Sequence, residues 1–256
     1  MTVSAVQDVH IAAGAETEKA RAAGRPRLLT LLTIITPLAV LGGLYMALFY
    51  ARMDVTQGEV QRLFYIHVSA FSGAFVAFAA AVVGGIQYLR TRQTRWDTLA
   101  LAGVEVGFAL SLINLILGMI WARPIWNTWW TWDPRLTSAA IMILTYAAYL
   151  MLRNGIENPE TRRRFASVYG ILAMTTVIAT LIITRIRPDT IHPAVIGPSP
   201  QNAQGTFEFG ETMRATLGLN SAIWSILVPA TLMWYRIRLQ NMADRVQAMK
   251  ADLLSK

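Results

Sequence analysis

Cysteine is absent from this sequence, and charged residues and histidines are scarce. With no cysteine, the chain forms no disulfide and performs no thiol chemistry of its own. Charged residues make up 15% of the chain, compared with about a quarter in soluble domains. No internal repeat is visible, so the inverted-repeat architecture of many transporters has no support. What is present is a chain that is 54% hydrophobic, with a mean hydropathy of +0.41, which is typical of a membrane protein.

Six long apolar runs account for this composition. They cover residues 28–50, 63–89, 98–121, 136–152, 165–184 and 215–235, and only the third contains a charged residue. Each run reaches or approaches the ~20 residues that a membrane-spanning helix requires. The sequence therefore predicts an all-α integral membrane protein, built as a bundle of six transmembrane helices with a short Trp-rich segment at the outer face.

The polar ends of the chain define the remaining parts of the predicted organisation. Residues 1–27 are rich in Ala, Gly and charge, which predicts a disordered cytoplasmic tail. Residues 28–235 form the six-helix membrane domain, and residues 236–256 form a cytoplasmic amphipathic helix. The apolar positions of that last helix recur every three or four residues, at Met242, Val246, Met249 and Leu253.

The distribution of basic residues predicts the orientation in the membrane. The six spans divide the polar segments into two alternating sets. Sixteen of the 23 Lys and Arg residues fall in one set, which comprises residues 1–27, 90–97, 153–164 and 236–256. Because basic residues accumulate on the cytoplasmic side, both termini of this multi-pass protein are expected to be cytoplasmic. The net charge of +8 is explained by this orientation, so no nucleic-acid partner is expected.

A tryptophan cluster lies in one of the outward loops. Five of the eight tryptophans fall within twelve positions, at Trp121, Trp126, Trp129, Trp130 and Trp132. Tryptophan is large, flat and amphipathic, so such a cluster forms an apolar platform with N–H donors at its edge. It serves either to anchor the protein at the membrane interface or to hold a flat apolar ligand. Five so close together, outside an apolar span, exceed what anchoring needs.

The spacing within this cluster is compatible with a short helix. Trp126, Trp129, Trp130 and Asp133 fall at positions i, i+3, i+4 and i+7, so in a helix they would share one face. Pro124 suits the first turn of such a helix, and Pro134 would tend to end it.

Two histidines lie on the same side of the membrane as the tryptophan cluster. His67 is in the first turns of the second span and His192 is in the long outward loop, whereas His10 lies in the cytoplasmic tail and is given no role. Either histidine by itself is more often structural than a ligand. Together, two imidazoles are able to ligate one haem iron axially, and a tryptophan platform suits the flat macrocycle. Outward arginines, such as Arg62, Arg123, Arg135 and Arg187, would pair with the propionates.

Glu105 is the one charged residue inside a span, with Asn114 further along the same run. Acidic residues inside the membrane are costly and are functional by default. The alternative is that Glu105, near the cytoplasmic end, is hydrated or protonated and hydrogen-bonded. The sequence leaves both interpretations open.

Two segments resemble a known family. Residues 126–138 read WNTWWTWDPRLTS, which closely resembles the tryptophan-rich signature of haem-handling proteins in cytochrome c maturation, in the version of the haem exporter/delivery protein C (CcmC) type. Residues 58–68, GEVQRLFYIHV, are similar to that family's first outer loop, and His192-Pro193 matches its histidine in the third outer loop. Glu105 matches an acidic position in the third span. Ala122 and Asn127 stand where relatives commonly have glycine.

The resemblance implies a haem delivery protein and not an enzyme. His67 and His192 would be the axial ligands of haem b (iron protoporphyrin IX). Trp121, Trp126, Trp129, Trp130, Trp132, Asp133 and Arg135 would complete the binding site. The implied partners are a membrane-tethered haem chaperone (CcmE type), to which haem becomes covalently attached, an ATP-driven transporter-like complex, a small membrane subunit and the surrounding lipid.

Two other classes of function fit the sequence less well. A small-solute permease subunit, with tryptophans that only anchor it, would carry polar groups along several spans, whereas nearly all charges and amides lie outside them. A haem–cytochrome ligase would have more histidines and a longer chain. The sequence thus favours a protein that binds haem at the outer membrane face.

Overall fold

The computed structural model describes residues 26–195, 197–206 and 208–255. Residues 1–25 of the predicted disordered tail, which include His10, therefore lie outside the described residues. Within the described part, six helices are long and apolar enough to cross a membrane, which confirms the predicted six-helix, all-α membrane fold. In chain order the helices are α2 (Arg27–Tyr45), η1 (Met46–Tyr50), η2 (Glu59–Gln61), α3 (Arg62–Thr91), α4 (Thr94–Trp126), α5 (Pro134–Gly155), α6 (Pro159–Ile186), α7 (Glu211–Ala222), η3 (Ile223–Leu227) and α8 (Val228–Leu254).

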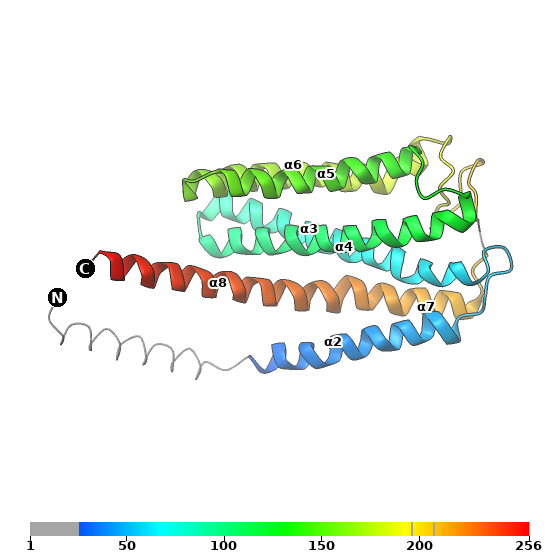
Figure 1. Cartoon of the computed structure of the whole chain (residues 1–256), viewed down its shortest axis with the longest axis horizontal. Helices are drawn as coiled ribbons and strands as arrows, with labels where there is room; N and C mark the ends of the chain where they lie inside the picture. Colours follow the sequence, from blue (N-terminus) through cyan, green and yellow to red (C-terminus); the bar gives the residue numbers. More distant parts are fainter. Residues whose placement is uncertain (1–25, 196, 207, 256) are drawn as a thin grey trace.

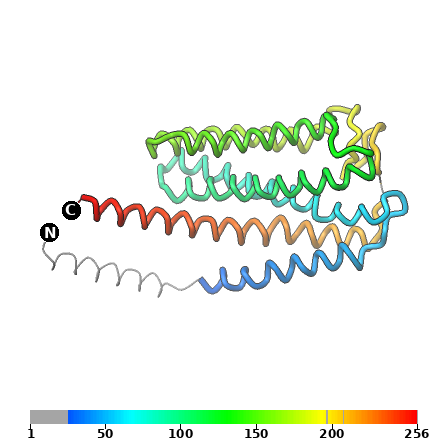
Figure 2. Tube along the Cα trace, viewed as in Figure 1, coloured from blue at the N-terminus to red at the C-terminus, as the bar shows by residue number. Residues whose placement is uncertain are grey.

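The helices run alternately up and down the bundle, and this places the three longer loops at one end (Figure 1). These loops join η1 to η2, α4 to α5 and α6 to α7, and we call this end of the molecule the loop end. The short α3–α4 and α5–α6 turns lie at the opposite end, as the backbone trace also shows (Figure 2). The segments that carry His67, the tryptophan cluster and His192 therefore meet at the loop end, as the sequence predicted.

Local sequence signals explain where the helices begin and turn. Asp133 and Asn158 cap α5 and α6 with their side chains, and each cap is followed by a proline at the first helical position. Proline suits that position because its φ is fixed and its missing N–H would have no partner there. Arg92, with a φ of 58°, takes the left-handed conformation that ends α3 and allows α4 to begin at Thr94.

Close packing of α3 on α4 builds the centre of the bundle. A Cβ atom added at Gly103 would lie 2.5 Å from the carbonyl oxygen of Ala77, so only glycine permits this approach of the two backbones. The ring of Phe78 of α3 stacks on the ring of Tyr146 of α5, with the two centroids 3.7 Å apart. The same buried cluster includes Val104 of α4, Val177 of α6 and Val228 of α8, so five of the six spans share one apolar core.

The sixth span continues without a break into the predicted amphipathic segment. α8 runs from Val228 to Leu254, and its final turns extend beyond the turns that join the other helices (Figure 1). Met242, Val246, Met249 and Leu253 are all exposed on this extension. The proposed division of the chain at residues 235 and 236 stays a prediction.

Candidate functional site

The tryptophan-rich segment is not a separate helix, although its spacing is compatible with one. α4 continues through Pro124 to Trp126, residues 127–133 are not helical, and α5 begins at Pro134. Pro134 starts a helix instead of ending one, because Asp133 supplies the cap that a helix beginning at proline can use. The tryptophans of the segment consequently do not share a helix face with Asp133.

Asn127 makes the turn that ends α4. Its φ of 55° is left-handed, a conformation that asparagine tolerates better than other residues with a side chain. The Arg123 guanidinium donates to both the carbonyl oxygen and the side-chain oxygen of Asn127, at 2.7 Å in each case. Ala122, by contrast, is buried within α4 and needs no special backbone angle. Asparagine therefore meets the backbone requirement at 127, and no glycine is needed at 122.

Two of the tryptophans face inward and connect the loops. Trp121 is buried and donates from Nε1 to the side-chain oxygen of Gln57, at 2.8 Å. Trp126 packs edge-to-face on Trp121, with centroids 5.1 Å apart, and on His192, with centroids 6.0 Å apart. The Gln57 amide in turn donates to the carbonyl oxygen of Gly205. These contacts join the first, second and third loops of the loop end.

The other three tryptophans lie further out. Trp129 is 54% exposed and Trp132 is 76% exposed, whereas Trp130 is partly buried and contacts Trp132 edge-to-face, with centroids 5.6 Å apart. Trp129 and Trp130 line a cavity beside the histidines, and Trp132 does not. Trp121 and Trp126 line the same cavity, so Trp132 is the member of the cluster that stands apart from the proposed ligand site.

His67 is held by α4 through its ring and its backbone. Its Nδ1–H donates to the carbonyl oxygen of Asn114 at 2.8 Å, because a carbonyl only accepts. The side-chain amide of Asn114 donates back to the carbonyl oxygen of His67, also at 2.8 Å. A Cβ atom at Gly118 would lie 2.9 Å from the ring, so glycine leaves the space that the imidazole fills. With the Nδ1 proton directed at this carbonyl, the lone pair of Nε2 is left for a metal.

His192 has the same hydrogen-bonding pattern on the third loop. Its Nδ1–H donates to the carbonyl oxygen of Pro193 at 2.7 Å, which again leaves Nε2 with the lone pair. Desolvation by the surrounding protein lowers the pKa of His192 to about 3, and the nearby Arg135 guanidinium acts in the same direction. The imidazole is thus neutral at physiological pH, which is the form that binds a metal.

Two neighbouring cavities bring the predicted residues together. The larger, of about 340 Å³, is lined by both histidines and by Phe71, Trp121 and Arg135, among others. The smaller, of about 60 Å³, is lined by both histidines and by Trp126, Trp129, Trp130 and Arg135, among others. Two imidazoles, aromatic walls and a cation match what a flat apolar ligand with an iron and carboxylates requires.

The arginines separate into two groups. Arg135 and Arg185 line the larger cavity. The Arg135 guanidinium also lies over the Phe71 ring, 5.4 Å from its centroid. The other predicted outward arginines line neither cavity. Arg123 and Arg187 bond within their own segments, to Asn127 and Asp189. Arg62 bonds to Glu59 and to the main-chain carbonyls of Ala47 and Ala51. Arg135 and Arg185 are therefore the candidates for binding ligand carboxylates.

Asp133 lies behind the cavities and does not line them. Its carboxylate is 8% exposed and accepts hydrogen bonds from the start of α5 and from the loop that carries His192. The structure thus brings together seven of the predicted residues, namely His67, His192, Trp121, Trp126, Trp129, Trp130 and Arg135.

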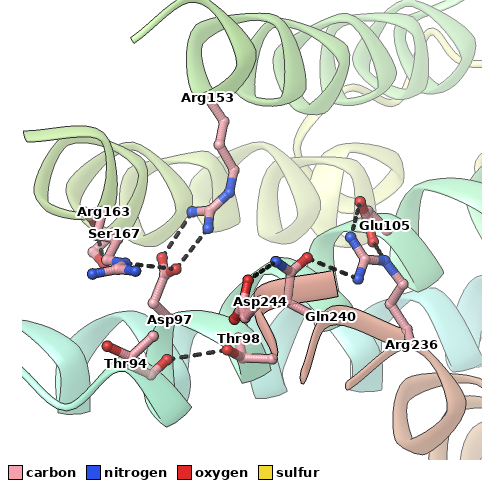
Figure 3. A network of polar contacts seen from close by, with 10 residues as sticks. All are labelled: Thr94, Asp97, Thr98, Glu105, Arg153, Arg163, Ser167, Arg236, Gln240 and Asp244. Atoms are coloured by element: carbon pink, nitrogen blue, oxygen red, sulfur yellow. Dashed lines mark hydrogen bonds and ion pairs between the residues drawn. The ribbon is translucent and has the colours of Figure 1, made fainter. Parts of the chain in front are cut away.

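Glu105 lies away from the loop end and forms an ion pair. The Arg236 guanidinium of α8 donates to its carboxylate, with Nη2 3.0 Å from Oε1, and also to the side-chain oxygen of Gln240, at 3.1 Å (Figure 3). The Gln240 amide continues the chain of contacts to Asp244, at 2.8 Å. Glu105 therefore joins α4 to α8, and a functional role for it stays a prediction.

A second ion cluster in the same region was not anticipated from the sequence. The Asp97 carboxylate receives two hydrogen bonds from the Arg153 guanidinium, at 2.6 and 2.7 Å, and lies 3.6 Å from Arg163 (Figure 3). Asp97 is 3% exposed. The cluster ties α4, α5 and α6 together near the short turns, and an acidic residue in the first turn of a span was the only sequence signal for it.

Sequence reasoning also missed several residues of the loop end. Gln57, Gly118, Arg185 and Thr190 each contact or flank a predicted site residue, yet none belongs to a recognisable motif. Arg185 alone had a usable signal, because it directly follows an apolar run on the outward side. The others act through contacts between distant segments.

The fold and the site together define a class of protein. It is a multi-pass, all-helical membrane protein with cavities lined by two histidines and by tryptophans at one end of its bundle. A sequence profile of the family described as "Heme exporter protein C" (CcmC) matches residues 13–251. The chain belongs to this family.

Individual relatives agree with that assignment. The chain is 35% identical over 156 residues to "Heme exporter protein C" of Rhodobacter capsulatus, a match that covers 60% of this chain and 63% of the relative. It is 34% identical over 134 residues to the protein of that name from Paracoccus denitrificans, covering 52% of this chain and 54% of the relative. The Escherichia coli K12 protein is 31% identical over 138 residues, covering 52% and 54%. The chain thus spans less than two thirds of the length of each of these relatives.

Proposed function

We propose that this protein binds haem b at the outer face of the bacterial inner membrane and delivers it for cytochrome c biogenesis. The observation that carries the proposal is the pair of histidines that line the same two cavities, each with its Nδ1–H bonded to a main-chain carbonyl. Membership in the "Heme exporter protein C" family supports the same function. Haem is the cargo here, and it supplies the iron that His67 and His192 would ligate.

The walls of the cavities supply the remaining recognition. The aromatic rings of Trp126, Trp129 and Trp130 offer flat apolar surface to the macrocycle. Arg135 and Arg185 would pair with the propionates, because guanidinium groups bind carboxylates through charge-assisted hydrogen bonds. A donor set of two imidazoles with two cations therefore fits haem better than it fits a small polar solute.

Delivery requires a partner, and the exposed tryptophans are the surface to which it would dock. Trp129 is exposed and lines the smaller cavity, and Trp132 is exposed further out, against Trp130. We infer that the membrane-tethered haem chaperone of the CcmE type receives haem here and that the covalent chemistry takes place on that partner. The ATP-driven complex and the small membrane subunit would act beside this protein in the membrane. On this proposal the protein itself is not an enzyme.

Absorption spectroscopy of the purified protein tests haem binding. The wild type should carry low-spin haem, as expected for iron with two axial imidazoles. His67→Ala and His192→Ala should each lower the haem content or convert the spectrum from low spin, whereas His10→Ala should change nothing. An unchanged low-spin spectrum in the His67→Ala/His192→Ala double variant would disprove the bis-histidine assignment.

Cysteine labelling tests the proposed orientation, since the chain has no native cysteine. Asn202→Cys lies in the third loop of the loop end, and Ser255→Cys follows α8 at the opposite end. In sealed cells an impermeant thiol reagent should label Asn202→Cys and leave Ser255→Cys unlabelled, because most basic residues lie on the side of Ser255. The reverse labelling pattern would place the haem site in the cytoplasm and contradict the proposal.

A further inference from the structure

The Asp133 carboxylate connects two parts of the site that are far apart in sequence. Its Oδ1 accepts from the backbone N–H groups of Arg135, at 2.8 Å, and Leu136, at 3.4 Å, and so caps α5. Its Oδ2 accepts from the hydroxyl of Thr190, at 2.6 Å, and from the backbone N–H of Ile191, at 2.8 Å. Both oxygens are therefore occupied by donors of this chain.

Thr190 extends the connection to the histidine. Its side chain is 0% exposed, and its hydroxyl oxygen accepts the backbone N–H of His192 at 3.2 Å while its proton goes to Asp133. A continuous path of hydrogen bonds therefore runs from the start of α5, through Asp133 and Thr190, to the backbone of His192. The bonds to the Asp133 carboxylate are charge-assisted, and the one from Thr190 is also buried, so these bonds are stronger than a neutral bond at the surface.

The first turn of α5 also positions a second residue that lines the cavities, Arg135. Arg135 follows Asp133 by two residues, and its side chain lines both cavities with His192. The cap that begins α5 therefore sets the position of Arg135, and the Thr190 bond sets the third loop relative to that cap. One carboxylate thus links the backbone at Arg135 to the loop that carries His192.

We propose that Thr190, together with Asp133, is a positioning residue that holds His192 in place for axial ligation of haem. This inference rests on the proposed haem-binding function. It gives the aspartate of the tryptophan-rich segment an internal role, since a carboxylate with four donors from its own chain has little capacity left for a partner protein. Thr190 acts through the backbone of His192 and does not touch the ligand.

Three substitutions separate this role from a direct contact of Asp133 with the chaperone. Thr190→Val keeps the shape of the side chain and removes its hydroxyl. Asp133→Asn keeps an oxygen for capping α5, but its amide nitrogen is unable to accept from the N–H of Ile191. Thr190→Ser restores the hydroxyl. Thr145→Val is the matched control, because the Thr145 hydroxyl is exposed and bonds only to Ile141 of its own helix.

Two readouts are needed. The first is haem affinity and spin state, measured by titration and absorption. Thr190→Val and Asp133→Asn should each weaken haem binding by about ten- to a hundredfold, as expected for losing a buried hydrogen bond to a charged group, and should reduce the low-spin fraction. Thr190→Ser should restore both properties, and Thr145→Val should leave them unchanged. The double variant should be no worse than the more affected single variant, because both changes break the same path.

The second readout is hydrogen exchange in the haem-free protein. The amide of Ile191 should exchange faster in Thr190→Val and Asp133→Asn than in the wild type, because its acceptor is lost or displaced. If Thr190→Val leaves the haem spectrum and this exchange rate at wild-type values, the inference is wrong. It is equally wrong if Asp133→Asn abolishes haem transfer with an intact spectrum while Thr190→Val has no effect, since Asp133 then contacts the chaperone. A wild type without low-spin haem would instead refute the proposed function, and the exchange rates would still decide whether the path exists.

Discussion

Replacing Gly118 by alanine is expected to displace His67 and weaken haem binding. Gly118 lies on α4 against the imidazole, and a Cβ atom there would lie 2.9 Å from Cε1 of the ring and 3.3 Å from Nδ1. The ring has no easy escape, because its Nδ1–H is bonded to the carbonyl oxygen of Asn114 in the same helix. An added methyl group therefore pushes directly on a proposed axial ligand.

The size of the effect follows from these distances. Ordinary van der Waals contact begins near 3.4 Å, so the ring must move by about 0.5 Å. Such a movement stretches the 2.8 Å bond to Asn114 toward the limit for N–H···O hydrogen bonds. The weakened bond costs about 1 kcal/mol, and an imidazole forced from its preferred rotamer costs about 0.5–1.5 kcal/mol. Because each 1.4 kcal/mol is about tenfold in affinity, haem should bind about ten- to sixtyfold more weakly.

Haem titration followed by absorption spectroscopy measures this change. The matched control is Gly218→Ala in α7, where an added Cβ atom meets nothing within 4 Å. Both substitutions gain about 1 kcal/mol of helix propensity, so a difference between the two variants reports the contact with His67. If both variants bind haem with the same affinity and the same spectrum, the close packing of Gly118 on the ligand has no consequence and the reasoning fails.

Two further predictions follow from the burial of particular side chains. Trp129→Ala should lower haem affinity more than Trp132→Ala, because Trp129 lines a cavity and Trp132 is 76% exposed and does not; equal effects on titration would favour a general anchoring role for the cluster. Arg153→Ala should lower the free energy of unfolding by about 3–5 kcal/mol, since it leaves the buried Asp97 carboxylate without its main partner. Arg187→Ala removes an exposed ion pair and should leave thermal unfolding unchanged, and a matching loss of stability there would contradict this ranking.

The membrane fold was predictable because its signal is local. Each span is a run of apolar residues, and all six runs lie within helices of the structure. The tryptophan segment was harder because the spacing of Trp126, Trp129 and Trp130 is compatible with a helix but does not require one. A proline is able to end one helix or to begin the next. Pro134 begins α5, because Asp133 before it caps that helix.

The gathering of His67, His192 and the tryptophans at one end was also predictable, since alternation of the spans fixes which loops share a side. The partners of the arginines are not given by the alternation of the spans. Arg62 and Arg187 have acidic neighbours three and two residues away, which explains the ion pairs that they form with these neighbours. The bond between Thr190 and Asp133 spans 57 residues and depends on how two loops meet, which no local pattern encodes.

The main-chain acceptors of the two imidazoles bear on how firmly this site would hold its cargo. A carboxylate acceptor would draw the Nδ1 proton strongly and make the opposite nitrogen a more basic donor to iron. The carbonyl groups of Asn114 and Pro193 are neutral, so they do not raise the basicity of His67 and His192 as a carboxylate would. Ligands of this kind favour reversible binding, which a carrier needs if it is to release what it holds. Because the acceptors belong to the backbone, replacing the side chain of Asn114 would leave the carbonyl bonded to His67 in place.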